Sequence, residues 1–250
     1  MTGADFRPTP LRDGQPLRAP EAPRAAMTRV RHHRDPALLA GGHRTASESD
    51  LKRAAEIAGL GCLCLTFDLR GHAATREMRD QITPRQNFED VLAAYDLLVS
   101  QPMVDKRAIA VIGSSYGAHL APLLSEARPV RWMSLRVPAI YRDQHWDKPK
   151  GKIDRIDLNL FRSQEMAPRE NRALGACVDF RGDALGIESE SDDYIPHPTI
   201  ANYVGAFRRA CSLTYRVIAG ADHGLSDERS RAAYTTLLVR RIKEMAVGAR

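Results

Sequence analysis

The chain has 250 residues, of which 43% are hydrophobic and 27% are charged. This balance is typical of globular proteins and excludes a wholly disordered, collagen-like or coiled-coil chain. The formal net charge is +6. No apolar run approaches the roughly 18 residues that a membrane-spanning helix requires, so we expect no membrane span.

Residues 1–35 are rich in proline and arginine and poor in large aliphatic side chains. Such a segment cannot bury enough apolar surface to offset the entropy lost on ordering, so we expect a flexible N-terminal tail with one short edge strand near Gln15–Leu17. Its arginines show no periodicity and no interleaved aromatic residues, which predicts no nucleic-acid binding. The tail lacks the apolar segment of a secretory signal, which predicts a cytoplasmic protein.

Short apolar runs alternate with segments of helical period across residues 36–250. The alternation predicts one α/β domain with a mostly parallel central sheet and helices on both faces. Asn87 is expected to cap its helix, with Glu89 and Asp90 in the first turn. The expected strands are Ala37–Ala40, Cys62–Phe67, Ala108–Ile112, Trp132–Arg136, Ala184–Glu188 and Leu213–Ile218, and the expected helices are Ser47–Ala58, Asn87–Ser100, Tyr116–Glu126, Pro198–Ala210 and Asp227–Met245.

The polar interval 141–179 separates two of these strands by far more than the usual connection. In a parallel α/β sheet, ligands bind at the carboxyl ends of the strands. We therefore expect this interval to form a short lid insertion over that edge. Its run Lys148-Pro149-Lys150-Gly151-Lys152 is typical of an exposed, charged loop, and the alternative is that on a lid it weakly favours anionic substrates.

The most informative motif is Gly113-Ser114-Ser115-Tyr116-Gly117, which lies between a predicted strand and a predicted helix. A Gly-x-Ser-x-Gly sequence in that context is a nucleophile elbow, in which the central serine takes a strained backbone conformation and the glycines leave room for it. Ser115 is therefore the candidate nucleophile.

A serine hydroxyl attacks a carbonyl only when a base removes its proton, and a carboxylate must orient that base. In a fold with such an elbow, the acid and the histidine follow the serine in that order. His223 lies in the loop after the last predicted strand, and a turn with three acids, Glu190, Asp192 and Asp193, follows the strand before it.

Four segments of the chain resemble motifs of the α/β-hydrolase superfamily. They are the elbow, the stretch Asp68–His72, the Asp192-x-x-Ile195-Pro196 turn and the Asp222-His223-Gly224 loop. The likeness spans about Asp35 to Arg250 and is similar to small bacterial serine esterases and serine aminopeptidase-like members, and more remotely to the prolyl-oligopeptidase catalytic domain. The resemblance implies the α/β-hydrolase fold and an acyl-enzyme mechanism, with Ser115 as nucleophile, Asp192 as acid and His223 as base.

An oxyanion hole needs two backbone donors. One is expected from Tyr116, the residue after the nucleophile, and the other from the loop after the first core strand. There the sequence Gly41-Gly42-His43 offers Gly42 as the matched glycine and the His43 amide as donor, although the loop departs from the family's usual His-Gly-x-Gly. Pro122, within the helix after the elbow, is expected to kink or shorten that helix.

The remaining histidines and cysteines that could take part in catalysis or metal binding are expected to have structural roles. His72 is expected to support Asp68 or Arg70 in its loop, and His119 to pack behind the elbow. The four cysteines form no Cys-x-x-Cys pair and are expected to be buried small hydrophobes, with neither metal site nor disulfide.

The sequence thus predicts a serine hydrolase that cleaves a carboxylic ester, thioester or small amide of a small-molecule acyl substrate, without a cofactor or metal. Two alternatives stay open. The departures in the Gly41–Ala46 loop and at Pro122 suit a catalytically weak or inactive ligand-binding relative, and the family resemblance also includes aminopeptidase-like peptidases.

Overall fold

The computed structural model describes residues 25–28, 35–42 and 48–248. Within these ranges seven strands form one sheet in the order β1-β3-β2-β4-β5-β6-β7. Neighbouring strands are parallel except for β1 and β3, which pair antiparallel. The strands are β1 (Ala25–Thr28), β2 (Asp35–Gly42), β3 (Leu63–Asp68), β4 (Val104–Ser114), β5 (Trp132–Arg136), β6 (Asp183–Ser189) and β7 (Ser212–Ile218).

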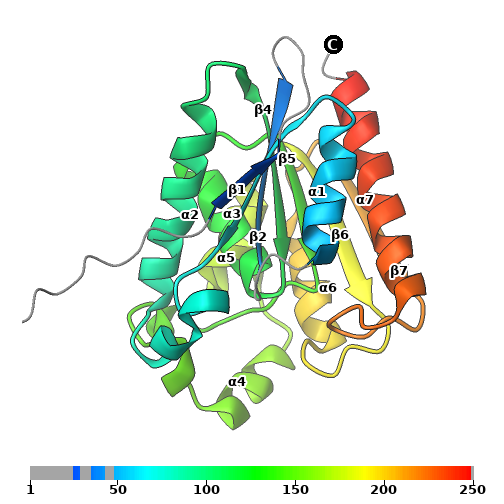
Figure 1. Cartoon of the computed structure of the whole chain (residues 1–250). Coiled ribbons are helices and arrows are strands. Elements are labelled where there is room, and N and C mark those ends of the chain that lie inside the picture. Colours follow the sequence, from blue (N-terminus) through cyan, green and yellow to red (C-terminus); the bar gives the residue numbers. More distant parts are fainter. Residues whose placement is uncertain (1–24, 29–34, 43–47, 249–250) are drawn as a thin grey trace, which may run out of the picture.

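Helices cover both faces of the sheet, as predicted (Figure 1). One face carries α1 (Glu48–Ala58) and α7 (Glu228–Gly248), which contact each other. The opposite face carries α2 (Pro84–Val99), α3 (Tyr116–Ala127), α5 (Arg172–Asp179) and α6 (His197–Ala206), with α3 packed against α5.

Successive side chains along each strand point to opposite faces of the sheet, and this alternation divides the core into two clusters. In β4, Ile109 and Val111 belong to the cluster under α2 and α3, whereas Ala108, Ala110 and Ile112 belong to the cluster under α1 and α7. Because both faces are buried, β4 reads as a continuous apolar run. Packing on both faces holds the carboxyl end of β4 in place. The elbow follows directly after this end.

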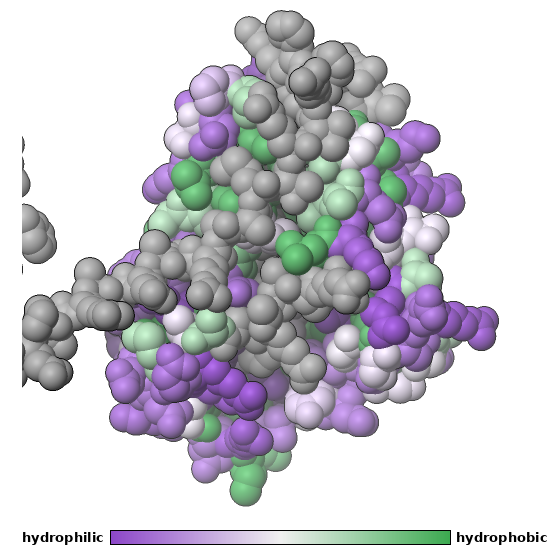
Figure 2. Space-filling view, viewed as in Figure 1, coloured by the Kyte–Doolittle hydropathy of each residue, from purple (hydrophilic) through white to green (hydrophobic). Residues whose placement is uncertain are grey.

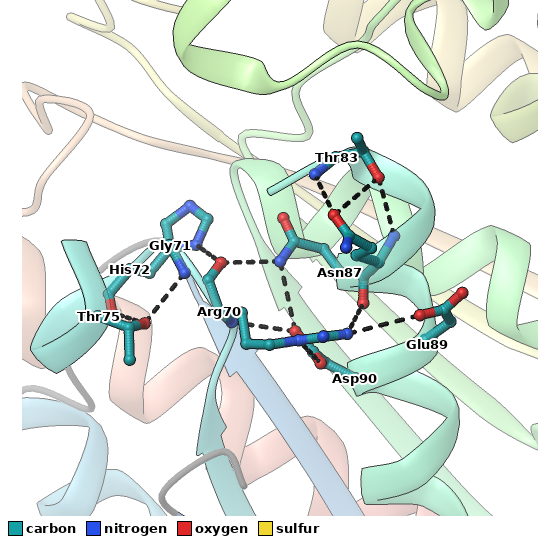
Figure 3. A network of polar contacts seen from close by, with 9 residues as sticks. Arg70, Gly71, His72, Thr75, Thr83, Asn87, Glu89 and Asp90 are labelled. Carbon is teal, nitrogen blue, oxygen red and sulfur yellow. Dashed lines mark hydrogen bonds and ion pairs between the residues drawn. The ribbon is translucent and has the colours of Figure 1, made fainter. Parts of the chain in front are cut away.

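The loop after β3 is tied to α2 by a buried polar network (Figure 3). The Arg70 guanidinium donates to Asp90 at 2.6 Å and to the Gln86 carbonyl at 2.8 Å, and the Asn87 side chain donates to the Arg70 carbonyl at 2.8 Å. The Nδ1 atom of His72 lies 3.1 Å from that same carbonyl. His72 therefore contacts Arg70, as the sequence predicts.

The start of α2 differs from the prediction. The helix begins at Pro84 with Thr83 as its cap, and Thr83 and Gln86 form a reciprocal capping box. Proline at the first helical position and this box define the start. Asn87 and Asp90 thus lie inside the helix, where their side chains hold Arg70 instead of capping.

Two other predicted boundaries differ as well. The helix α3 runs through Pro122 to Ala127, so the proline neither ends nor shortens it. The helix α6 ends at Ala206, because Phe207 has a non-helical backbone conformation, whereas the prediction extended it to Ala210.

The interval 141–179 contains α4 (Arg155–Arg162), three short 3₁₀ helices and α5. Since α5 packs on α3 in the helical layer, only the part before it projects beyond the carboxyl ends of the strands, with α4 at the tip (Figure 1). Ile156 and Leu160 of α4 are 74% and 63% exposed, and an apolar patch is visible at that tip (Figure 2).

Most of the predicted tail, including the expected strand at Gln15–Leu17, lies outside the described residues. The part that is described contains a strand that the sequence did not predict, β1, which pairs with the edge of β3 from Ala25 opposite Phe67 to Thr28 opposite Cys64. Across residues 25–28, 35–42 and 48–248, no helix combines the length and the hydropathy needed to span a bilayer.

Candidate active site

Ser115 occupies the turn between β4 and α3, with φ 53° and ψ −112°. A positive φ at a non-glycine residue is strained and persists only where its surroundings enforce it. Here the Ser115 amide donates to the Arg136 carbonyl at 2.9 Å, and its carbonyl accepts from the Ala139 amide at 3.0 Å. The segment after β5 therefore clamps the serine backbone on both sides.

Gly113 makes this turn sterically possible. A Cβ atom at residue 113 would lie 2.5 Å from the Ala118 Cα and 2.6 Å from the Gly117 carbonyl oxygen. Both are backbone atoms, which cannot move aside without opening the turn. The requirement for glycine at the first position of the motif thus follows from the approach of α3 to β4.

The structure brings together the three residues predicted from the sequence. The His223 Nε2 atom lies 3.0 Å from the Ser115 Oγ, and its Nδ1 atom lies 2.7 Å from Asp192 Oδ2. Ser115 follows β4, Asp192 lies in the turn after β6, and His223 lies in the loop after β7. Because parallel strands end at one edge of the sheet, three distant segments meet there.

The surroundings of Asp192 favour the ionised form of its side chain. Burial of this side chain opposes ionisation, but the hydrogen bond from His223, the histidine's charge, and the amides of Ile195 and Tyr194 outweigh that effect and hold the pKa of Asp192 below its ordinary value. Those amides donate to Oδ1 at 2.9 and 2.8 Å, which leaves Oδ2 for the imidazole.

The two neighbouring acids do not reach the histidine. The Glu190 carboxylate accepts from the Gly220 amide at 2.7 Å, and Asp193 is exposed. The choice of Asp192 from the Asp-x-x-Ile-Pro pattern therefore agrees with the geometry.

Arg136, at the end of β5, also supports the His223 loop, a role for which no motif in the sequence provides a signal. Its Nη1 donates to the His223 carbonyl at 2.9 Å, and its guanidinium lies 5.6 Å from the centre of the Tyr234 ring. Arg136 is only 8% exposed. A buried cation thus fixes the backbone that carries the imidazole.

The structure describes two of the three residues predicted to form the oxyanion hole. Tyr116 is the first residue of α3, so its amide lies at the positive end of that helix. Gly42 is the last residue of β2, and its neighbour Gly41 pairs with Gly113 of β4, which brings the end of β2 beside the elbow. His43 lies outside the described residues.

A buried cluster of rings and one cation surrounds the Tyr116 side chain. The His72 and His119 rings stack with it at centroid distances of 5.7 and 6.3 Å, and Tyr141 meets it edge-on at 5.4 Å. The Lys150 Nζ atom lies 3.5 Å from the Tyr116 ring centre and 2.8 Å from His72 Nε2.

The burial of Lys150 corrects the expectation that residues 148–152 form only an exposed, charged loop. Lys150 is 8% exposed, whereas its neighbours Gly151 and Lys152 are exposed. Burial, reinforced by the positive charges of Arg79 and Arg162, holds the pKa of the Lys150 amine well below its ordinary value. Favourable contact with the Tyr116 ring face accounts for its position.

No group of three or more metal-ligating side chains occurs among the described residues. Cys62, Cys64 and Cys177 are buried, as predicted, but Cys211 is exposed. Its thiol donates to the Arg181 carbonyl at 3.0 Å, so its position reflects a local contact near the start of β7.

A family model describes part of the chain. The model of the prolyl oligopeptidase family matches residues 50–136, which is less than half of the sequence. The match includes the elbow but ends before Asp192 and His223. No curated protein matches the sequence significantly.

Solved structures match nearly the whole fold at low sequence identity. An esterase domain of a Rhodothermus marinus protein is 19% identical, with a TM-score of 0.63 over 88% of this chain and 92% of that one. Est1E from Butyrivibrio proteoclasticus, solved with ferulic acid, is 12% identical, with a TM-score of 0.64 over 90% and 94%. An alpha-beta serine hydrolase homologue from Coxiella burnetii is 15% identical, with a TM-score of 0.61 over 87% and 90%.

These likenesses agree with the strand order, the helices on both faces and the elbow between β4 and α3. The chain has the α/β-hydrolase fold.

Proposed function

We propose that the protein is a serine hydrolase that cleaves a carboxylic ester of a small acyl substrate through an acyl-serine intermediate, without a cofactor. One observation carries the proposal. The imidazole of His223 lies within hydrogen-bond distance of both the Ser115 hydroxyl and the Asp192 carboxylate. This is the arrangement that turns a poor nucleophile into an effective one.

In the first half of the reaction, Ser115 Oγ attacks the ester carbonyl while His223 Nε2 accepts the hydroxyl proton. Asp192 accepts the hydrogen bond from Nδ1–H, fixes the imidazole tautomer and stabilises the imidazolium that forms. The Tyr116 amide is the first donor to the developing oxyanion, with the amide of His43 as the expected second.

The tetrahedral intermediate collapses when the imidazolium gives its proton to the departing alkoxide, which leaves the acyl group on Ser115. Water then attacks the acyl carbonyl while His223 takes a proton from it. When this second intermediate collapses, His223 gives the proton to Ser115 Oγ, and the serine and the carboxylic acid are released.

An aminopeptidase would need a carboxylate near the insertion to hold the substrate amine, and Asp154, Glu165 and Glu170 are the candidates. Asp154 caps α4 by accepting from the Ile156 and Asp157 amides, and Glu170 accepts from the Ala167 amide. Glu165 is exposed, so the choice of ester over peptide substrates does not rest on these acids. The similarity to structures described as esterases favours ester cleavage instead.

The test uses the purified protein with chromogenic acetyl and butyryl esters and a serine-directed phosphonate. We expect a burst of chromophore that matches the enzyme concentration, and covalent labelling at Ser115. The Ser115→Ala variant is expected to lose labelling and to lower kcat by a factor on the order of 10⁶.

A different result would favour the alternative of a ligand-binding relative. If neither protein turns over any ester, if the phosphonate leaves Ser115 unmodified, and if ligand binding survives Ser115→Ala, the hydrolase proposal is wrong.

A further inference from the structure

Arg162 is a buried cation at the end of α4. It is 7% exposed, and it is anchored by two long hydrogen bonds of 3.4 Å, from Nε to the Ile140 carbonyl and from Nη1 to the Tyr194 carbonyl. Its guanidinium also lies 5.1 Å from the centre of the Tyr141 ring. Its Nη2 atom makes no hydrogen bond within the described ranges.

The two anchors of Arg162 place it beside the proposed catalytic residues. Ile140 follows Ala139, whose amide holds the Ser115 carbonyl. Tyr194 donates its amide to Asp192, and its ring lies against the His223 ring with centroids 5.1 Å apart. Arg162 therefore bridges the segment that clamps the nucleophile and the turn that carries the acid.

Arg162 is the buried arginine of the insertion, and it has no acidic partner. Arg142, Arg169 and Arg172 pair with Asp157, Asp179 and Asp143, and Arg155 is exposed to solvent. Among the described residues no carboxylate lies within ion-pair distance of Arg162. Arg162 is therefore neither paired with a carboxylate nor exposed to water, although a buried charge is costly unless it is paired.

Lys150 adds a second positive charge near the nucleophile. Its Nζ atom lies over the ring of Tyr116, the residue next to Ser115. The charge of Arg162 is close enough to disfavour the protonated forms of both Lys150 and His119. Lys150 contacts the Tyr116 ring and Arg162 lies over the Tyr141 ring, and these two rings meet edge-on at 5.4 Å. The two cations therefore share one region, in which an anion would relieve the repulsion.

We propose that Arg162 and Lys150 form a subsite for a carboxylate carried on the acyl part of the substrate, so that the preferred substrates are half-esters of dicarboxylic acids. The subsite rests on the proposed function, because it specifies what the acyl group carries. Arg162 supplies a donor to the distal carboxylate, and Lys150 supplies positive potential beside the oxyanion donor at Tyr116. The acyl side is chosen because Lys150 lies over the ring of Tyr116, whose amide is the proposed donor to the carbonyl oxygen, whereas the alcohol departs toward His223.

The kinetic test compares esters that differ in one distal group. Mono-ethyl glutarate and mono-ethyl adipate are matched with ethyl pentanoate and ethyl hexanoate, and the released acid is titrated at neutral pH. We expect kcat/KM of the wild-type protein to favour one half-ester by roughly tenfold to a hundredfold, the value of a charge-assisted hydrogen bond.

Arg162→Gln is expected to abolish this preference mainly through KM. Loss of its anchors to Ile140 and Tyr194 would lower kcat/KM for half-esters and neutral esters alike, so the ratio of the two values isolates the subsite. Arg162→Lys keeps the charge and is expected to retain part of the preference. The control is Arg155→Gln, because Arg155 lies on the same helix but is exposed, and it is expected to behave as the wild-type protein does. Urea unfolding establishes that each variant is folded. If Arg162→Gln is not folded, Lys150→Met and Arg162→Lys are used in its place.

Calorimetric titration with glutarate tests the subsite independently of turnover. Glutarate is expected to bind the Ser115→Ala protein, and to lose binding when Arg162→Gln is added but not when Arg155→Gln is added.

Different failures have different meanings. Wild-type protein that hydrolyses neutral esters as well as half-esters, and does not bind glutarate, would refute the subsite while the proposed function stands. Protein that binds glutarate through Arg162 but turns over no ester, with no phosphonate labelling, would refute the proposed function instead. Preference for an acetyl ester of a hydroxy acid over both half-esters would overturn the placement of the carboxylate on the acyl side.

Discussion

The imidazole of His223 can contact only one of the acids in the turn after β6. Asp192 lies 2.7 Å from His223 Nδ1, and its own side chain is 3% exposed. The neighbouring Asp193 is exposed and makes no such contact. Asp192 and Asp193 are adjacent in the chain. Replacing either one with asparagine removes one negative charge from the same turn, so the two variants differ in whether the lost carboxylate contacts His223.

We expect Asp192→Asn to lower kcat by about 10⁴, because an amide at this position stabilises the wrong imidazole tautomer. Asp193→Asn is expected to leave kcat unchanged. Steady-state hydrolysis of a butyryl ester measures both. Equal losses in the two variants, or a loss only in the Asp193 variant, would contradict the assignment of the acid.

At the scale of elements, the elbow depends on how closely α3 approaches β4. Gly113→Ala would place a methyl group 2.5 Å from the Ala118 Cα, so the helix must shift and carry Ser115 with it. We expect loss of phosphonate labelling and a lower urea midpoint, since overpacking against backbone costs about 1–3 kcal/mol or more.

The matched control is Gly205→Ala in α6, where an added Cβ meets nothing within 4 Å. This change is expected to leave labelling intact and to raise stability by up to about 1 kcal/mol, the difference in helix propensity. If Gly113→Ala labels as readily as Gly205→Ala does, the steric argument for the elbow fails.

The sequence predicted the elements whose signals are local. The strands β4, β5 and β6, the elbow and the His223 loop each follow from an apolar run or a short motif. The strand β1 was missed because its four residues, Ala25–Thr28, lie in a proline- and arginine-rich stretch and pair only with a strand edge. Lys150 and Arg162 were missed because their surroundings, the Tyr116 ring and the carbonyls of Ile140 and Tyr194, come from other segments of the chain.

At the scale of the whole molecule, two buried histidines make stability depend on pH. Burial and the charges of Arg162, Lys150 and Arg172 lower the pKa of His119 to about 3. Burial and Lys150 likewise lower the pKa of His72 to about 3, with Arg79 adding to the effect. Both histidines are therefore neutral in the folded protein near pH 7.

An unfolded chain takes up these protons near the ordinary histidine pKa of 6.5, whereas the folded protein does so only near 3. Folding stability is therefore full above pH 6.5 and decreases as the pH falls toward 3. Between pH 6.5 and about 5 each histidine is expected to remove about 2 kcal/mol from the free energy of unfolding.

Urea unfolding at several pH values measures this slope. His119→Gln is expected to reduce it by the contribution of one proton. Tyr203→Phe, which removes the hydroxyl 3.3 Å from His119 Nδ1 but keeps the histidine, is expected to leave it unchanged. A slope that is the same in the wild-type and His119→Gln proteins would show that this histidine is protonated in the folded state.

The order of the proposed catalytic residues along the chain has a consequence for synthesis. Ser115 leaves the ribosome 108 residues before His223, and β7 must join β6 before the loop that carries the imidazole is in place. A nascent or truncated chain therefore has the alcohol but no proton acceptor and is inert toward acyl groups. Hydrolytic activity would then report completion of the entire sheet, which makes it a sensitive assay for co-translational folding of this protein.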